Sequence, residues 1–143
     1  MADDGRLQPY HLAIPAHDLG AAEAFYCGSL GCGKGRSDAC WMDLDFFGHQ
    51  LTLHLVEDVD VAASANLVDG DQVPSRHFGV VLEMTTWQAL ADRLEQAGCE
   101  FLTAPRIKFQ GEVGEQATMF LFDPSGNALE FKSFADPTQL FAT

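Results

Sequence analysis

An internal repeat constrains the fold of this chain more than any other feature. His11 opens the first copy and precedes Gly31 by 20 residues, and His77 opens the second and precedes Gly98 by 21. A Cys follows both glycines, and strand-forming segments follow in each copy. The period is near 66 residues, and tandem units of this size usually pack their sheets into one shared core. Two coincidentally similar α+β segments are the alternative, but the near-equal spacing favours a tandem repeat of βαβββ modules.

The spacing of apolar residues predicts the elements of each module. Strand side chains alternate between two faces, whereas helical apolar residues recur every three or four positions. The first module is expected at about 7–56, a connector at 57–75, the second module at about 76–134 and a tail at 135–143. Helices are expected at 19–30 and 86–98, and loops at 32–39 and 106–116. The acidic, Pro- and Gly-punctuated connector is interpreted as a link with one short helical turn.

The composition is typical of one globular domain. A chain of 143 residues fits a single domain, and its net charge of −13 argues against nucleic acid and anionic membrane surfaces as partners. The N-terminus lacks the apolar segment of a signal peptide, and no apolar run has the length of a membrane span. A cytoplasmic protein is therefore expected. The four cysteines fit no paired zinc-binding spacing and are expected to be reduced thiols.

Three residues lie where strand alternation leaves room for a ligand. The stretch at 123–131, DPSGNALEF, is a turn followed by a strand. In that strand Glu130 points to the face opposite the apolar residues and has a small neighbour on its own face. His11 and His77 also lie on the non-core faces of their strands, each beside a small residue. A lone His on a strand is usually a structural residue, but two in equivalent positions of a repeat favour a metal site.

The motifs HLAIPAHDLGAAEAFYCGSLG, HFGVVLE and FLFDPSGNALEF resemble those of the vicinal oxygen chelate superfamily. This superfamily includes glyoxalase I, bleomycin-resistance proteins, methylmalonyl-CoA epimerase and the extradiol ring-cleavage dioxygenases. The resemblance runs from about Leu7 to Phe134. It implies an α+β fold in which two βαβββ modules form a half-open barrel, with a divalent metal ion on the concave face.

The resemblance also implies which residues bind the metal. The four ligand positions of the family correspond to His11, Thr52, His77 and Glu130, and Thr is not a usual ligand. Two His and one Glu form the facial triad of non-haem Fe(II) oxygenases, so Fe(II) is favoured, with Zn, Mn, Ni or Co as alternatives. Gln50 or His54, on the same strand face as Thr52, would become a fourth ligand after a small register shift. Otherwise His54 is the candidate catalytic residue for proton transfer.

Three classes of function remain open from the sequence. An extradiol-dioxygenase-like enzyme is favoured by the 2-His-1-Glu set. Phe120, however, stands where those enzymes keep a Tyr, and the loop QGEVGEQA lacks their His. A glyoxalase- or epimerase-type lyase or isomerase is the second class, and a metal-free drug-binding protein is the third.

The same resemblance bears on the substrate and on assembly. A small oxygenated molecule is the expected substrate, and the candidate contacts to it are Gln50, Thr52, Arg106 and Phe120. Arg36, Arg106 and Lys108 are few among many acids, so a cluster of them would select an anionic ligand. Small members of this family commonly pair, and the tail carries apolar residues that need burial. A homodimer is therefore expected.

Overall fold

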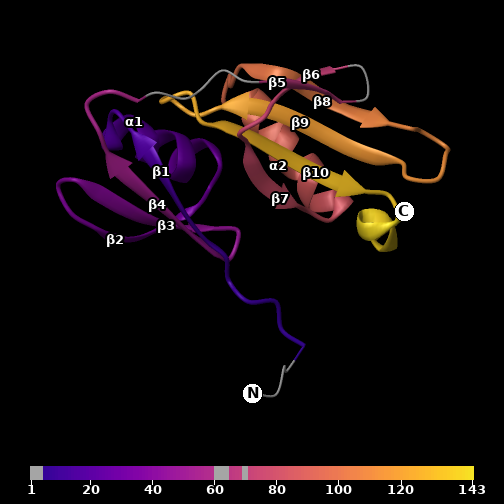
Figure 1. The fold of residues 1–143 in the computed structure, drawn as a ribbon, viewed down its shortest axis with the longest axis horizontal. Coiled ribbons are helices and arrows are strands. Elements are labelled where there is room, and N and C mark those ends of the chain that lie inside the picture. The colour runs from indigo at the N-terminus through magenta and orange to yellow at the C-terminus, as the bar shows by residue number, and fades with distance from the viewer. Residues whose placement is uncertain (1–4, 60–64, 69–70) are drawn as a thin grey trace. The chain divides into compact units, whose positions relative to one another are not determined.

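The computed structural model describes residues 5–59, 65–68 and 71–143. The chain divides into two compact units, residues 1–59 and 60–143. Each unit contains one four-stranded mixed sheet, and the strands of the two sheets follow the same connectivity (Figure 1). The predicted α+β fold with two βαβββ modules is confirmed, and the unit boundary falls inside the expected connector.

The first unit is built on strands whose apolar residues alternate with polar ones. Its elements are β1 (His11–Ala16), α1 (Leu19–Glu23), the π-helical segment η1 (Ala24–Ser29), β2 (Gly33–Ser37), β3 (Trp41–Phe46) and β4 (His49–Leu55). The strand order is β1-β4-β3-β2, and β1 runs parallel to β4. The alternating residues Met42, Leu44 and Phe46 of β3 are all buried. Since strand faces alternate, the residues between them define the opposite, polar face of this sheet.

The helical region of the first unit begins and ends where its sequence predicts. Asp18 is the N-cap, and its carboxylate accepts a hydrogen bond from the Ala21 N–H at 2.9 Å. The second half widens to π geometry, in which the Leu30 N–H donates to the Phe25 carbonyl five residues earlier. Tyr26, on this segment, is fully buried.

The second unit repeats this plan and adds a hairpin and a tail helix. Its elements are β5 (Ala65–Val68), β6 (Asp71–Pro74), β7 (Phe78–Val81), α2 (Met84–Gln96), β8 (Phe101–Lys108), β9 (Gln116–Phe122), β10 (Ala128–Phe134) and the 3-10 helix η2 (Pro137–Phe141). Strands β5 and β6 form a separate two-stranded sheet, and the main sheet has the order β7-β10-β9-β8. As in the first unit, the first strand of the module pairs in parallel with the last.

Helix α2 fixes β10 from the apolar side of the sheet. Trp87, Leu90, Ala91 and Leu94 recur at helical spacing and are buried. The indole N–H of Trp87 also donates a 2.9 Å hydrogen bond to the Phe131 carbonyl in the middle of β10. The strand that carries Glu130 is therefore held by both apolar packing and a buried polar contact.

Three local predictions were wrong. The expected loop at 32–39 contains the edge strand β2, because its Gly-rich backbone pairs with β3 although its side chains are exposed. The connector, expected as a link, contains the paired strands β5 and β6. Residues 60–64 and 69–70 of it lie outside the described part of the chain, so the helical turn stays a prediction. Strand β8 extends to Lys108 and so takes up the start of the expected loop at 106–116. In the described residues no helix is long and apolar enough to cross a membrane.

Candidate functional site

A tightly bonded turn sets the start of β10 and thus the position of Glu130. One carboxylate oxygen of Asp123 accepts hydrogen bonds from the N–H groups of Ser125 and Asn127, both at 2.9 Å. The other accepts from the Asn127 amide at 2.8 Å. Gly126 adopts a positive φ of 83°, which closes the turn. Since Asp123 and Asn127 are buried, the turn is a fixed part of the sheet.

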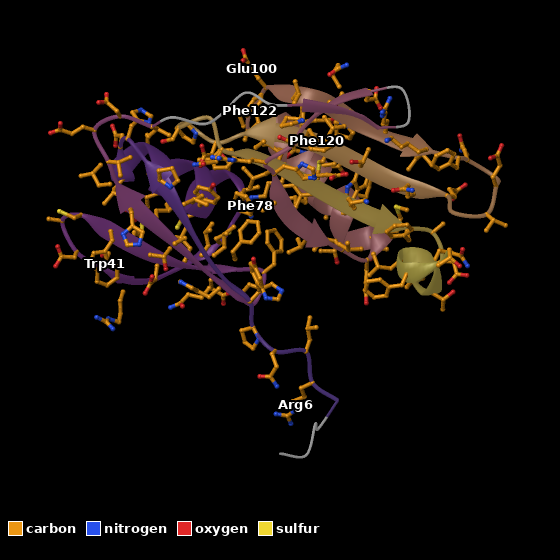
Figure 2. The ribbon with its side chains drawn as sticks, viewed as in Figure 1. Arg6, Trp41, Phe78, Glu100, Phe120 and Phe122 are labelled. Atoms are coloured by element: carbon orange, nitrogen blue, oxygen red, sulfur yellow. The ribbon has the colours of Figure 1, made fainter. Side chains whose placement is uncertain are left out.

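His77 and Glu130 form a pair on the polar side of this sheet. Nε2 of His77 lies 3.2 Å from Oε2 of Glu130. Oε1 of Glu130 accepts a 2.9 Å hydrogen bond from the hydroxyl of Thr118, which is 2% exposed. The His77 ring also contacts Phe120 edge-on, with centroids 5.1 Å apart. Figure 2 shows Phe120 on β9, where it is the register partner of Glu130. One carboxylate oxygen is thus anchored, and the other faces the imidazole.

The backbone determines which nitrogen of His77 carries a proton. Nδ1 lies 2.6 Å from the carbonyl oxygen of Pro74, at the end of β6. A carbonyl only accepts hydrogen bonds, so Nδ1 is the donor, and Nε2 is the nitrogen that faces the carboxylate. Nε2 of His77 and Oε2 of Glu130 lie 3.2 Å apart, and each atom has a lone pair that can face the other. The contact is therefore favourable when a proton lies between the two atoms or when both bind one cation.

Gly79 allows the close approach of β7 to β10 beside this pair. It is the register partner of Glu130 in the parallel pairing. A Cβ atom at this position would lie 1.6 Å from the Glu130 carbonyl oxygen, far inside any possible contact. A side chain here would therefore push the Glu130 backbone away.

The first unit has the same strand register around His11. His11 pairs with Gln50 and Ala13 pairs with Thr52, so Thr52 occupies the place that Glu130 has opposite Gly79. The hydroxyl of Thr52 donates a 2.6 Å hydrogen bond to Oδ1 of Asp43 on β3. In the second unit the carboxylate, Glu130, is on β10, which pairs directly with the first strand of its module, β7. In the first unit the carboxylate, Asp43, is on β3, which is separated from the first strand, β1, by β4.

The remaining candidate residues are distributed over both units. Gln50 is exposed, and its amide lies 3.5 Å from Oδ2 of Asp43. His54 is exposed two residues beyond Thr52 and pairs in register with Trp41. In the second unit the guanidinium of Arg106 forms an ion pair with Asp71 of β6. Lys108 lies 3.7 Å from the same carboxylate, so both cations help to fix the β5–β6 hairpin to β8.

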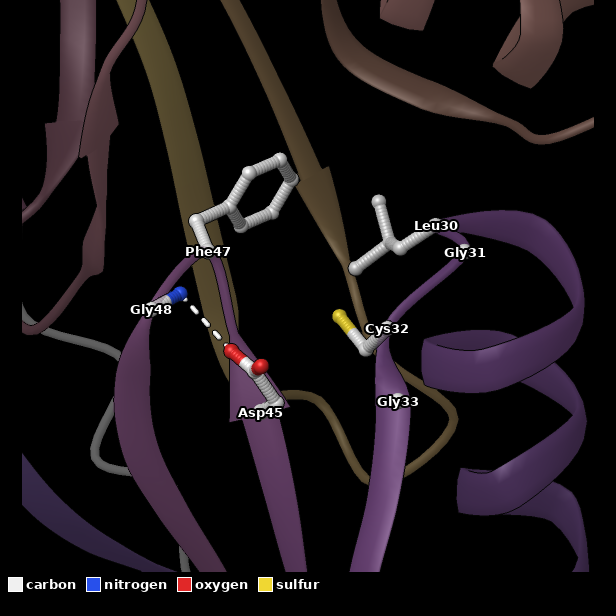
Figure 3. Close-up of a pocket in the computed structure, with 7 residues that line it drawn as sticks. All are labelled: Leu30, Gly31, Cys32, Gly33, Asp45, Phe47 and Gly48. Carbon is white, nitrogen blue, oxygen red and sulfur yellow. Dashed lines mark hydrogen bonds between the residues drawn. The ribbon is translucent and has the colours of Figure 1, made fainter.

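The described part of the first unit carries a hollow and an open groove. One has a volume of about 270 Å³ and is lined by Leu30, Gly31, Cys32, Gly33, Asp45, Phe47 and Gly48. Figure 3 shows the Cys32 thiol, the Leu30 side chain and the Phe47 ring facing one space, while Asp45 accepts the Gly48 N–H at 2.7 Å. The other is an open groove of about 370 Å³ along β2, β3 and β4.

Sequence reasoning missed three groups that orient the candidate site. Thr118 and the Pro74 carbonyl fix Glu130 and His77, and Asp43 supplies the carboxylate of the first unit. The alternation in WMDLDF was sufficient to put Asp43 on the face of Thr52, but the cross-strand register was needed to bring them together. Within each unit, the described residues contain no group of three or more His, Cys, Asp or Glu side chains placed to hold a metal ion.

The fold and its paired strands define a two-module protein with a His–Glu pair on the second sheet. The family model of the Glyoxalase/Bleomycin resistance protein/Dioxygenase superfamily matches residues 8–131. The chain belongs to this superfamily. No curated protein matches the chain significantly.

Solved structures agree with this assignment. A glyoxalase/bleomycin resistance protein/dioxygenase from Alicyclobacillus acidocaldarius is 36% identical, with a TM-score of 0.79 over 94% of this chain and 96% of that one. A lactoylglutathione lyase from Agrobacterium tumefaciens is 20% identical, with a TM-score of 0.63 over 88% and 92% of the two chains. A glyoxalase/dioxygenase from Nostoc punctiforme is 14% identical, with a TM-score of 0.65 over 95% and 97%. The last two show likeness of fold alone.

Proposed function

We propose that this protein is a metal-dependent enzyme acting on a small oxygenated substrate, and that His11, His77 and Glu130 bind one divalent ion, with Fe(II) favoured. The observation that carries the proposal is the His77–Glu130 pair. Nε2 of His77 and Oε2 of Glu130 lie 3.2 Å apart, and each side chain is oriented through its other polar atom. His11 belongs to the first unit and enters the proposal through its equivalence to His77 in the repeat.

The surroundings of the pair suit a metal site. A His that binds metal usually donates its other ring N–H to a carboxylate or a backbone carbonyl, which fixes the ring and raises its basicity. The Pro74 carbonyl supplies such a contact to His77. The Thr118 hydroxyl in the same way leaves Oε2 of Glu130 as the oxygen available to an ion. The residues present therefore fit a cation held by imidazole nitrogen and carboxylate oxygen.

The occupant of the fourth family position favours a three-ligand site. The Thr52 hydroxyl donates its proton to Asp43 at 2.6 Å, and Thr52 is 7% exposed. A neutral hydroxyl already engaged in this way is a poor ligand for a divalent ion. Two imidazoles and one carboxylate leave coordination positions open, as in the oxygenases that use this set. This supports a dioxygenase-like reaction over one that needs four protein ligands.

The protein groups have distinct roles in this proposal. A bound divalent ion would act as a Lewis acid and as a template for vicinal oxygen atoms of the substrate. Glu130 and the two imidazoles would orient the substrate by fixing the ion. Phe120 would supply an apolar wall beside His77, and exposed His54 would exchange protons with the substrate or with water.

A lyase or isomerase of the glyoxalase or epimerase type is the second candidate. The observation that favours it is Phe120, whose side chain stands next to Glu130 and has no hydroxyl to donate. In such an enzyme a carboxylate would remove a proton next to a carbonyl group. Oxygen uptake with catechols would indicate the first reaction, and turnover of 2-oxoaldehyde–thiol adducts without oxygen would indicate the second.

Metal content tests the proposal before any substrate is known. Protein purified under anaerobic conditions without added metal should contain one divalent ion per chain. The variants His11→Ala, His77→Ala and Glu130→Ala should each lose it, because each removes one of three ligands. His17→Ala is the matched control, since His17 is an exposed His on the same module as His11 and is outside the ligand positions. Full metal content in all three ligand variants would refute the metal site.

The expected homodimer remains a prediction. In the tail helix η2, Leu140 is 38% exposed and Phe141 is 88% exposed. Burial of this apolar surface in a second copy would stabilise a pair. Light scattering should give twice the monomer mass, and a monomer at micromolar concentration would contradict the prediction.

A further inference from the structure

We propose that the groove on the first unit binds a small carboxylate that carries a hydroxyl or an ammonium group on the adjacent carbon. The groove lies along β2, β3 and β4 and has a volume of about 370 Å³. This is at the lower end of the range for small-molecule sites. The proposal rests on the first unit alone and does not require a bound metal ion.

Asp43 is the hydrogen-bond acceptor of this groove. Its Oδ1 accepts from the Thr52 hydroxyl at 2.6 Å, and its Oδ2 lies 3.5 Å from the Gln50 amide. A carboxylate offers about four lone-pair positions, so two contacts from β4 leave capacity for a ligand donor. These contacts also fix the orientation of the carboxylate, which lowers the entropic cost of binding.

Arg36 is the corresponding cation. Its guanidinium carbon lies 5.4 Å from the centroid of the Trp41 ring, an arrangement that steadies the side chain by a cation–π contact. Figure 2 marks Trp41 on β3, and Arg36 and Asp43 line the same groove. Among the described residues Arg36 forms no ion pair, whereas Lys34 is paired with Glu23 at 3.1 Å. Its fork of N–H donors is thus free to bind a carboxylate.

A glycine opens the space beside Asp43. Gly35 lies on the edge strand β2, and a Cβ atom there would lie 3.3 Å from the Cβ of Asp43. That distance is tighter than ordinary contact, so any larger side chain would cover the flank of the carboxylate. Asp45, the other acid of the groove, accepts the Gly48 N–H at 2.7 Å. Asp43 is the acid whose flank Gly35 leaves open.

The ligand chemistry follows from this pair of charges. An acceptor and a guanidinium that line one groove match a molecule with a donor next to an anionic group. A simple carboxylate would satisfy Arg36 but would bring no donor to the remaining lone pairs of Asp43 and would be repelled by its charge. A hydroxyl or ammonium on the neighbouring carbon offsets that repulsion with a charge-assisted hydrogen bond to Asp43.

Three acids that differ in one group provide the test. Lactate, alanine and propionate share a three-carbon carboxylate and carry a hydroxyl, an ammonium or a hydrogen on the second carbon. Binding to the full chain, treated with EDTA so that metal chelation contributes nothing, is measured by chemical-shift titration. Lactate or alanine should bind in the millimolar range and at least about tenfold more tightly than propionate. Which of the two binds identifies whether the donor is a hydroxyl or an ammonium.

Variants link the preference to the groove. Asp43→Asn should remove the preference over propionate, Arg36→Gln should weaken all binding, and Gly35→Ala should weaken binding of the preferred acid. Asp38→Asn is the matched control, because it makes the same charge change in the first unit outside the groove. Circular dichroism and the melting temperature confirm that each variant folds. Equal binding of the three acids, no binding of any of them, or an Asp43→Asn variant with unchanged preference would overturn the proposal.

Discussion

Replacing Gly79 by Ala should destabilise the second unit and disturb the candidate metal site together. The added Cβ would lie 1.6 Å from the Glu130 carbonyl oxygen, and real Cβ contacts essentially never fall below 3.0 Å. The two atoms must therefore separate by about 1.4 Å, the difference between these distances. The obstacle is backbone rather than a flexible side chain, so β7 and β10 have to move apart.

The size of the effect follows from two opposing contributions. Ala lowers the entropy of the unfolded chain and so stabilises the fold by about 0.4–1 kcal/mol. Forcing a methyl group into a packed site costs typically about 1–3 kcal/mol, and a backbone clash lies towards the upper end. We expect the free energy of unfolding to fall by about 2 kcal/mol. For a chain of this length that lowers the melting temperature by roughly 4–8 °C.

Calorimetry and metal analysis on the same samples test this expectation. Gly79→Ala should melt earlier and bind metal at least about tenfold more weakly, because Glu130 moves with its backbone. Gly33→Ala is the control, because Gly33 is on the edge strand β2 and its added Cβ would make an ordinary 3.6 Å contact with the Cβ of Asp45. A Gly79→Ala protein with wild-type melting temperature and metal affinity would refute the reasoning.

Three further predictions concern single side chains. Ser133→Ala should raise the free energy of unfolding by about 1 kcal/mol in urea titrations, because the buried Ser133 hydroxyl has no hydrogen-bond partner among the described residues. A lower free energy of unfolding would contradict this. Phe109→Asn should raise the free energy of unfolding by about 0.5–1 kcal/mol, since Phe109 has a φ of 55° and Asn tolerates that conformation. Burial raises the pKa of the Cys27 thiol, so at pH 8 its thiolate fraction is lower than at the ordinary pKa of a thiol. Exposed Cys40 should therefore be alkylated before Cys27 in a mass-spectrometric time course.

Much of the fold could be predicted because both copies of the repeat show the same order of strands and helix. Apolar alternation located strands such as β4 and β10, and helical spacing located α2, since each buries one face in a core. Strand β2 was missed because its residues are all exposed, so no apolar pattern marks it. The β5–β6 hairpin was missed for a related reason, since its sequence is acidic and rich in turn-forming residues.

The candidate site was predictable in residue type but not in its supporting contacts. The sequence alone shows that His11 and His77 are equivalent in the repeat. It also shows that Glu130 lies on the strand face opposite the apolar residues. The orientation of His77 by the Pro74 carbonyl and of Glu130 by Thr118 depends on which strands and turns meet. Likewise, Thr52 is hydrogen-bonded to Asp43 through a cross-strand register that spacing alone does not reveal.

The most direct test of the central claim is the ligand count around the bound ion. X-ray absorption of protein loaded with one divalent ion per chain counts imidazoles by their outer-shell scattering. We predict two imidazoles together with oxygen donors, at first-shell distances of about 2.0–2.2 Å, and one imidazole fewer in His77→Ala. A spectrum with sulfur donors, or with no imidazole at all, would contradict the assignment of His11, His77 and Glu130 as the metal ligands.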